Sequence, residues 1–366
     1  MNRLIVALAA AACAALGPAL AASAFTPQTT AANQALTWLH AQQSADGTVA
    51  GSASRTEETV FGLVANGASV ADFATSGKTA VDSLRSHIAG EEQSAGNIGS
   101  LIMAVSAAEL DPTSFAGHNL LQDLACTYVA STGAYNAQLF NDALAVLAIP
   151  SGGVPAKAVD FLSGQQQADG GWEFAAGFGS DTNTTSIVLM ALESANGLTS
   201  VAKDRALAYL KTQQQPSGGF DYAVSGDSDP NSDAAVIEAL LAAGQDPAGT
   251  TWSLAGKNAV TDLLTFQYSN GGFGFGRPGS SATAAPDPFS TTQALPALAS
   301  HSLPVTRTAG TMPSSCPAPS TTPAATPTPV SPSTQRLAQT GSPAVPAVVL
   351  GLCLIALGWR LRRRTQ

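Results

Sequence analysis

The sequence predicts an all-α fold built from repeated helix pairs, because one pattern of residues recurs along most of the chain. The pattern is clearest in Lys157–Trp172, KAVDFLSGQQQADGGW, where apolar side chains at helical spacing precede a pair of glycines. Glycine enters left-handed backbone conformations at little cost, so this pair predicts the end of the helix. Copies follow at Arg205–Phe220 and Asn258–Phe273, and a weaker copy precedes them at Asn33–Val49.

Fixed offsets support the repeat. In each copy one leucine is followed by Gln four residues later and by Gly eight residues later. The matching residues are Leu39, Gln43 and Gly47; Leu162, Gln166 and Gly170; Leu210, Gln214 and Gly218; and Leu263, Gln267 and Gly271. Agreement of this kind in four copies predicts that the four segments share one local structure.

A second helix follows each of the three clear copies, and these second helices align without gaps. They begin as DTNTTSIVLMAL at Asp181, DPNSDAAVIEAL at Asp229 and DPFSTTQALPAL at Asp287. An acidic residue with Ser or Thr just ahead of an apolar run predicts a helix start with a cap. Apolar residues cover most of Ile187–Leu192, so we expect this helix to be buried on nearly all sides and to be the inner one of each pair.

The first helix of the repeat carries a resemblance to a known family. One set of residues resembles the QW repeat of squalene and oxidosqualene cyclases, which protein prenyltransferases share in looser form. The set is Lys157, Ala158, Phe161, Leu162, Gln166, Gly170 and Trp172. Arg205–Phe220 resembles it with Phe in place of Trp. The resemblance implies an α/α toroid over residues 31–301, a ring of paired inner and outer helices. Cobalamin carriers and complement-type thioester domains use the same ring, so the resemblance implies a fold rather than an activity.

About six helix pairs account for this ring. The first three pair a helix around Leu36–Leu39 with one over Glu57–Asn66, Val81–Ile88 with Ile98–Leu110, and Leu120–Leu124 with Leu139–Ile149. The three clear repeats supply the rest. The first and last repeats keep the Gln and Gly of the internal ones instead of a polar capping surface. We therefore expect a closed ring, with an open solenoid as the alternative.

Composition limits the function. The chain has 366 residues, of which 45% are apolar and 11% charged, which suits one large domain with a sizeable core. Removing Arg3 and the four arginines at positions 360 and 362–364, which lie in segments expected to be cleaved, leaves 11 basic against 25 acidic residues, a net charge of −14. Such a surface repels nucleic acid and anionic membranes. We expect a monomer with no nucleic-acid partner.

Residues 1–24 are typical of a secretory signal peptide. Arg3 supplies a basic start, residues 4–20 are apolar, and Ala22-Ser23-Ala24 is a cleavage site of the A-x-A type. The mature chain is expected to begin at Phe25, and the toroid domain then covers residues 25–301. Residues 302–336 are rich in Pro, Thr, Ser and Ala, which predicts an extended, disordered stalk.

Residues 337–366 resemble a Gram-positive sortase signal of the L-A-x-T-G type, with an apolar run over 344–359 and a basic tail after it. The motif residues are Leu337, Ala338, Gln339, Thr340 and Gly341. The resemblance implies that a sortase joins Thr340 to peptidoglycan and removes the transmembrane segment, so the protein would be secreted and attached to the cell wall. A plain C-terminal membrane anchor is the alternative.

Two cysteines, Cys126 and Cys316, remain in the predicted mature chain. An oxidising compartment permits a disulfide between them. It would join the start of the stalk to the third outer helix, although the sequence does not show whether the two lie close together.

The residues that carry chemistry in related toroids are missing here. The sequence has no D-x-D-D run like that of class II terpene cyclases, no zinc-ligand set like that of prenyltransferases, and no thioester motif around Cys126. Asp227, Asp229, Asn231, Asp233 and Glu238 have an EF-hand-like spacing, but Ser232 occupies the position that needs glycine. No metal and no cofactor are therefore expected, and an enzyme is the less favoured interpretation.

A ligand site is expected in the loops after the glycine pairs and at the starts of the inner helices, where aromatic and polar side chains gather. The candidate residues are Phe174, Phe178, Asp181, Tyr222, Asp229, Asn231, Phe275, Asp287 and Phe289. Trp172, Phe220 and Phe273 are expected instead to pack against neighbouring helices.

Capping bonds and the helix dipole are expected to lower the carboxyl pKa of Asp181, Asp229 and Asp287, and the dipole to do the same for Asp233. Such groups are poor proton donors at neutral pH, so no general acid is expected. The sequence thus favours a wall-anchored toroid that binds an apolar, corrinoid-like or isoprenoid-like ligand. A diverged terpene-cyclase or prenyltransferase-type enzyme is the first alternative, and a structural or adhesive surface protein is the second.

Overall fold

The computed structural model describes residues 25–91, 94–135, 138–223, 226–281, 284–313 and 316. The predicted signal peptide, the sorting signal with Thr340 and most of the predicted stalk lie outside these residues. Within the described ranges, no helix combines the length and the apolar character that a membrane crossing requires.

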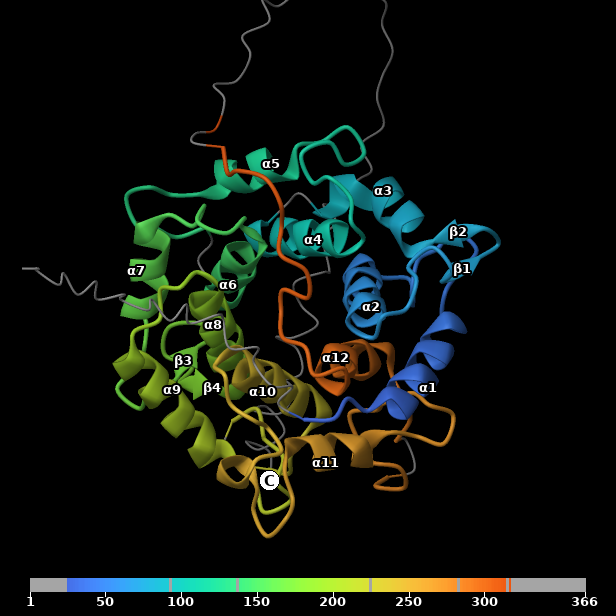
Figure 1. Ribbon diagram of the computed structural model, residues 1–366, viewed down its shortest axis with the longest axis vertical. Helices are drawn as coiled ribbons and strands as arrows, with labels where there is room; N and C mark the ends of the chain where they lie inside the picture. Colours follow the sequence, from blue (N-terminus) through green and yellow to red (C-terminus); the bar gives the residue numbers. More distant parts are fainter. Residues whose placement is uncertain are drawn as a thin grey trace, which may run out of the picture. The chain divides into compact units, whose positions relative to one another are not determined.

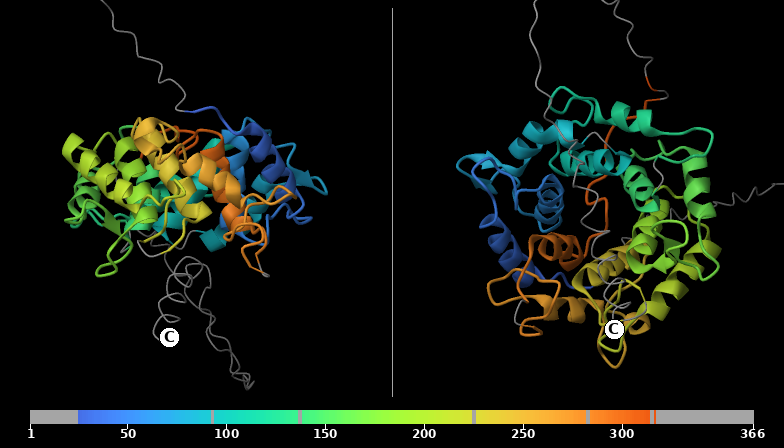
Figure 2. Two further views of the ribbon diagram at one scale, coloured as in Figure 1. Left: turned by 90° about the horizontal axis from the view of Figure 1, so that it is seen from below. Right: turned by 180° about the vertical axis from the view of Figure 1, so that it is seen from behind.

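The α-helices of the described residues form two layers of a ring (Figure 1). The outer layer contains α1 (Thr29–His40), α3 (Ala80–Glu91), α5 (Leu120–Thr127), α7 (Ala156–Gly164), α9 (Ser200–Gln213) and α11 (Ala259–Leu263). The inner layer contains α2 (Ala53–Ala65), α4 (Ala95–Ala107), α6 (Leu139–Ala148), α8 (Thr182–Ser194), α10 (Pro230–Ala242) and α12 (Pro288–Leu298). The same two layers are visible from the opposite face (Figure 2). The fold is the predicted α/α toroid of six helix pairs.

Short elements connect the helices. Single 3₁₀ turns span Thr250–Trp252 and Leu264–Phe266, the second directly after α11. Two antiparallel hairpins of two-residue strands pair β1 (Ala74–Thr75) with β2 (Lys78–Thr79) and β3 (Trp172–Glu173) with β4 (Ser180–Asp181).

The inner helices begin at capping side chains, as the sequence predicts. Asp181, Asp229 and Asp287 accept backbone N–H groups at the starts of α8, α10 and α12. The start of α2 is an exception to the prediction, because the helix begins at Ala53, with Ser52 as its cap, and not at Glu57. Polar residues in its first turn concealed one turn of helix from the apolar pattern.

The ring is closed by contacts between the last repeat and the first. The side-chain amide of Asn66, directly after α2, donates to the carbonyl of Leu295 in α12 at 3.2 Å. The backbone N–H of Gln28 donates to the carbonyl of Leu298 at 2.7 Å. A Cβ added to Gly62 would clash with the side chain of Leu295, so α2 and α12 pack closely. These contacts rule out the open solenoid.

The recurring spacing of Gln and Gly within the repeat has a structural basis. Gly170 has a φ of +96°, and a Cβ there would clash with the carbonyl oxygen of Arg205 in the next outer helix. Gln166 donates through Nε2 to the carbonyls of Gly170 and of Ala202, both at 2.9 Å. One amide thus fastens its own loop and the next repeat. The same pairs of bonds are made by Gln43 to Gly47 and Phe73, by Gln214 to Gly218 and Trp252, and by Gln267 to Gly271 and Ala31.

The aromatic residue after each glycine pair lies inside the wall of the ring. Trp172, Phe220 and Phe273 are fully buried, which confirms their expected packing role. The indole N–H of Trp172 donates to the carbonyl of Leu162 at 2.7 Å, so the ring of Trp172 covers the end of α7.

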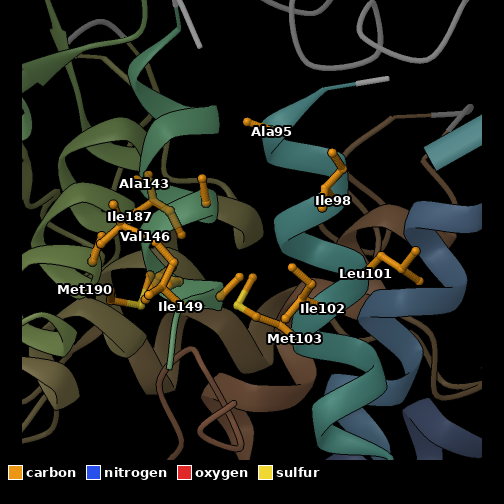
Figure 3. Close-up of a cluster of buried hydrophobic side chains, with 14 of the residues drawn as sticks. Ala95, Ile98, Leu101, Ile102, Met103, Ala143, Val146, Ile149, Ile187 and Met190 are labelled. Carbon is orange, nitrogen blue, oxygen red and sulfur yellow. The ribbon is translucent and has the colours of Figure 1, made fainter. Parts of the chain in front are cut away.

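A continuous apolar core joins neighbouring inner helices. Figure 3 shows Met103 of α4 and Met190 of α8 pointing from opposite sides toward Val146 and Ile149 at the end of α6. None of the four side chains is more than 3% exposed. Close packing of this kind holds each inner helix at a fixed distance from the next.

The start of the predicted stalk belongs to the ring. Residues 302–313, the strap, cross the ring from α12 toward α5 (orange in Figure 1). Leu303, Val305 and Met312 pack against the core cluster, and the hydroxyl of Ser106 donates to that of Thr308 at 3.3 Å. The predicted boundary at residue 302 is therefore too early. Apolar residues spaced irregularly among Pro and Thr gave no periodic signal from which this packing could be predicted.

A disulfide joins Cys316, just after the strap, to Cys126 in α5. The strap contacts Ser106 in α4 and Ser194 in α8, which lie at the C-terminal ends of these inner helices. The strap therefore crosses one end of the ring, and the capping aspartates lie at the other.

Candidate functional site

Most of the predicted site residues lie at the N-terminal ends of the inner helices. Phe174 directly follows β3, which pairs with Asp181 of β4, and Thr182 donates its backbone N–H to the carbonyl of Tyr222 at 2.9 Å. The structure thus brings Phe174, Asp181 and Tyr222 together between α8 and α10. In the last repeat, the backbone N–H of Phe275 donates to Asp287 at 3.0 Å.

The remaining predicted residues are dispersed. Asp229 and Asn231 lie at the start of α10, where Asp229 accepts the backbone N–H of Asn231 at 3.0 Å. Phe178 and Phe275 are half exposed in their loops. Phe289 in α12 contacts the guanidinium of Arg55 in α2, with 4.4 Å between Cζ and the ring centroid. The nine residues therefore do not form one site.

The expected low pKa of the capping carboxyls is wrong for the residues of the middle repeats. Burial raises the pKa of Asp181 to about 7 and that of Asp229 to about 6, although backbone N–H groups oppose the change. Burial also raises the pKa of Asp233 well above its usual value, and the nearby charge of Asp262 adds to the effect. Desolvation of these carboxyls outweighs the helix dipole.

Asp233 and Asp262 belong to a polar network between α10 and α11. Asp262 accepts the hydroxyl of Ser228 at 2.5 Å and the guanidinium of Arg277 at 2.8 Å. Asp233 accepts the backbone N–H of Phe220 at 2.6 Å. Arg277 thus compensates the charge of Asp262, whereas among the described residues no cation forms a salt bridge with Asp233.

Metal binding is not supported by this geometry. Within the described ranges, no group of three or more His, Cys, Asp or Glu side chains is arranged to hold a metal ion. In the EF-hand-like segment, Asp229 caps α10 and Asp233 holds a loop N–H, so both carboxylates already serve the fold.

Two carboxyls that are not among the predicted ligand-binding residues face the axis of the ring. In α2, α8, α10 and α12, the residue four positions after the cap accepts a loop N–H through its side-chain oxygen. This residue therefore faces the outer helices. Measured from that residue, the residues six and nine positions after the cap lie about 200° and 140° round the helix axis. They are therefore on the opposite face, toward the axis of the ring. Glu58 is six positions after Ser52, and Glu238 is nine positions after Asp229.

These two positions define the inner wall of the ring. Position six is occupied by Glu58, Ser100, Leu144, Ile187, Ala235 and Gln293. Position nine is occupied by Phe61, Met103, Leu147, Met190, Glu238 and Pro296, all of which are buried. At position six all but Ile187 are partly exposed, so the wall meets solvent there. The inner wall is therefore mainly apolar, and it carries two acidic residues.

Glu58 is held by partners on two helices. Its carboxylate forms a 2.7 Å ion pair with Arg55 and accepts the hydroxyl of Thr292 in α12 at 2.5 Å. Burial raises the pKa of Glu58, while the charge of Arg55 and the bond from Thr292 oppose that rise. Arg55 also stacks on Phe289, so one cation orients both an acid and an aromatic ring of the wall.

Glu238 has a different environment. Its side chain is 6% exposed, and among the described residues it forms no salt bridge. Burial raises its pKa well above the usual value, and the negative charge of Glu58 adds to the rise. Burial within this apolar layer thus favours the protonated form of the Glu238 carboxyl.

Glu58 and Glu238 could have been found by counting from the caps. An acidic residue inside a nearly continuous apolar helix is unusual, and its distance from the cap reveals the face on which it lies. In the sequence, Glu238 falls in the EF-hand-like spacing and Glu58 falls at the helix start expected at Glu57, so neither residue is predicted to face the axis.

Two hollows of about 280 and 360 Å³ lie outside the ring, beside the start of α1. Their side chains are uncharged, among them Thr30, Gln34 and Asn270. Neither hollow contains an acid, a base or an aromatic side chain, so neither offers the chemistry of the inner wall.

Comparisons with known proteins agree with the ring. No family model and no curated protein matches the sequence. The apo structure of the type II terpene cyclase MstE from Scytonema is similar at 15% identity, with 74% of this chain and 97% of that chain covered and a TM-score of 0.55. An MstE variant in complex with geranylgeranyl dihydroxybenzoate, its substrate, gives 14% identity, coverage of 75% and 97%, and a TM-score of 0.57. A protein from Actinoplanes is similar at 14% identity, with 75% of this chain and 99% of that chain covered and a TM-score of 0.54. At these identities the likeness shows the fold, a toroid of the terpene-cyclase type.

Proposed function

We propose that the ring binds an isoprenoid against its inner wall and that Glu238 donates a proton to this ligand. The observation that carries the proposal is a buried carboxyl without a salt bridge among the described residues, placed in an apolar layer that faces the axis of the ring, where burial raises its pKa. The fold supports it, because MstE, a toroid of similar structure, was solved with a geranylgeranyl substrate. The proposal is therefore an enzyme of the terpene-cyclase type, which is the first alternative that the sequence offers.

The raised pKa narrows the substrate class. A carboxyl whose pKa is raised by burial is a weaker acid than an exposed one, and an alkene carbon is a poor acceptor for its proton. An epoxide oxygen accepts a proton much more readily. We therefore favour an isoprenoid epoxide as the substrate, with the proton passing from Glu238 to the epoxide oxygen as the C–O bond breaks.

The other side chains of the wall suit this step. The positive charge that develops on carbon would lie near the carboxylate of Glu58, which Arg55 and Thr292 hold in place. An internal alkene of the substrate then captures the cation, and loss of a proton to the Glu238 carboxylate restores the acid. The apolar side chains of position nine exclude water, which would otherwise end the reaction early.

A binding protein without chemistry is the second candidate. It is favoured by one feature of the acid: Glu238 has no hydrogen-bonded neighbour among the described residues that would strengthen it as a proton donor. In that case the two carboxyls would bind the polar head of an isoprenoid or corrinoid-like ligand, and the ligand would leave unchanged.

The location outside the cell is a further part of the proposal. Its support is the order of the signal peptide, the Pro-rich segment and the L-A-x-T-G signal in the sequence. The ring would then act on, or bind, an isoprenoid that is accessible from the cell surface.

The test uses the predicted mature chain, residues 25–340, incubated with oxidosqualene and with squalene. We expect a cyclised product from the epoxide, detected by gas chromatography with mass spectrometry. Glu238→Gln keeps the shape of the side chain but removes the proton, so it should lower product formation by at least about 100-fold. Glu193→Gln, near the end of α8 beside Lys203, is the matched control and should leave it unchanged.

Native mass spectrometry of the same samples separates the two candidates. Retention of intact ligand by both the wild type and Glu238→Gln, without product, would support the binding protein. Absence of both product and bound ligand would contradict the proposed site altogether.

A further inference from the structure

The strap is held to the ring by contacts of two kinds. Along its length these contacts are noncovalent: the Ser106–Thr308 hydrogen bond, the guanidinium of Arg307 on the carbonyl of Ser194 at 2.9 Å, and the packing of Met312 near Gly153. At its end the contact is covalent, through Cys316 and Cys126. Any pull on the chain beyond the strap reaches the disulfide before it reaches these weak contacts.

The disulfide joins residues 190 positions apart. The loop that it closes contains helices α6 to α12 together with the strap. A stretching force that enters at the C-terminal side of Cys316 can therefore pass directly to α5 through Cys126. The residues between the two cysteines are bypassed, because a closed covalent loop cannot be extended from outside.

We propose that the Cys126–Cys316 disulfide is a mechanical shunt that keeps tension from the C-terminal tail away from the strap and from helices α6 to α12. The reason for such a device rests on the wall attachment in the proposed function, since a tethered surface protein is pulled through its C-terminal segment. The shunt itself depends only on the disulfide.

The part of the inner wall that α6 to α12 supply lies inside this loop. Glu238 lies in α10, and Gln293 and Thr292, which approach Glu58, lie in α12. All three residues are inside the protected loop. Without the disulfide, tension on the strap would act directly on the C-terminal end of α12 and peel the strap from α4 and α8.

Single-molecule force spectroscopy tests the proposal on residues 25–340, with handles at Phe25 and Thr340. In the wild type, only about 100 residues on the N-terminal side of Cys126 can unfold and lengthen the tether, by roughly 340 Å at about 3.4 Å per residue. In the double variant Cys126→Ser, Cys316→Ser, about 290 residues can extend, which gives roughly 1000 Å. The double variant should also show an early step of about 45 Å at low force, as the strap detaches.

Two further samples complete the experiment. Wild type treated with a thiol reductant should behave as the double variant does, because both cysteines are exposed. Arg307→Ala, which weakens the strap but leaves the disulfide intact, should behave as the untreated wild type does. An extension of about 1000 Å in the oxidised wild type, or a double variant without the early step, would overturn the proposal. Failure of wall attachment would appear separately, in cell fractionation, and would leave the force measurement unaffected.

Discussion

Asp233 and Thr185 accept the same hydrogen bond in neighbouring repeats. Thr185 Oγ1 accepts the backbone N–H of Trp172 at 2.9 Å, and Asp233 Oδ1 accepts that of Phe220 at 2.6 Å. Thr291 does the same for Phe273. The fold therefore needs an oxygen at this position but not a carboxyl, and the additional oxygen of Asp233 must be accommodated beside Asp262.

Replacing Asp233 with Thr should stabilise the protein at neutral pH by about 1–2 kcal/mol. The hydroxyl can still accept the N–H of Phe220, and the buried carboxyl is removed. Because folding raises the pKa of Asp233, its contribution to stability is complete below the unfolded value near 4 and is lost as the pH rises. The advantage of the variant should vanish near pH 4 and grow toward pH 7, as measured by chemical denaturation. Parallel pH profiles for the two proteins would contradict this.

Gly170→Ala should lower the free energy of unfolding by about 2–4 kcal/mol. The cause is the positive φ of Gly170 together with the clash of the new Cβ with Arg205. Gly164→Ala in the last turn of α7 is the matched control, because its Cβ would meet nothing within 4 Å. The control should be neutral or more stable by up to about 1 kcal/mol. Thermal unfolding measures both variants. Equal changes in midpoint for Gly170→Ala and Gly164→Ala would contradict the close approach of Gly170 to Arg205.

Gln267→Ala should cost about 1–3 kcal/mol, because it removes both bonds by which the last repeat is fastened to the first. Gln166→Ala removes the equivalent bonds at an internal seam, and the loss should be similar. Gln165→Ala, at an exposed side chain, should change stability by less than about 0.5 kcal/mol. If denaturant unfolding showed a loss for Gln166→Ala and none for Gln267→Ala, the closing seam would be looser than the structure indicates.

Trp172→Ala should reduce stability by about 3–5 kcal/mol, since it removes a fully buried aromatic side chain and its bond to Leu162. Phe178→Ala, at a residue that is 52% exposed, should cost no more than about 0.5 kcal/mol. Ligand binding at the inner wall should survive in any folded Trp172 variant. A folded and equally stable variant without binding would identify Trp172 as a site residue.

Thr340→Ala should leave the protein in the membrane fraction of the cell instead of the wall fraction. The resemblance to a sortase signal gives the reason, because the threonine carbonyl is the point of attachment to peptidoglycan. Fractionation followed by immunodetection measures the outcome, with Thr328→Ala in the same Pro-rich region as the control. Unchanged wall attachment of Thr340→Ala would contradict sortase processing.

The fold could be predicted in detail because each repeat depends on contacts that require particular residues at fixed positions. A Gln that must reach two carbonyls and a Gly that must tolerate a neighbouring backbone leave the same residues in every copy. The caps of the inner helices could be predicted for the same reason. The packing of residues 302–313 could not be predicted, since Leu303 and Met312 contact helices distant in sequence and follow no period.

The candidate site was predicted less well than the fold. Loop aromatics such as Phe174 were visible in the sequence because they follow the glycines at a fixed distance. Glu58 and Glu238 come from helices far apart in the chain, and only the closed ring brings their faces to a common axis. The capping aspartates were located correctly, but the degree of their burial, which reverses the direction of the pKa shift, depends on tertiary packing.

The bond from Gln267 to Ala31, which closes the ring, also limits whether a helix pair can be added or lost. Six pairs share one full turn, about 60° each, whereas seven pairs would require about 51° at every seam. Four of the six seams are fastened by a Gln and a glycine with one fixed spacing, so an inserted helix pair would require these seams to be refitted. An open array can grow or shrink one unit at a time. This ring should therefore accept substitutions and loop insertions more readily than a change in its number of repeats.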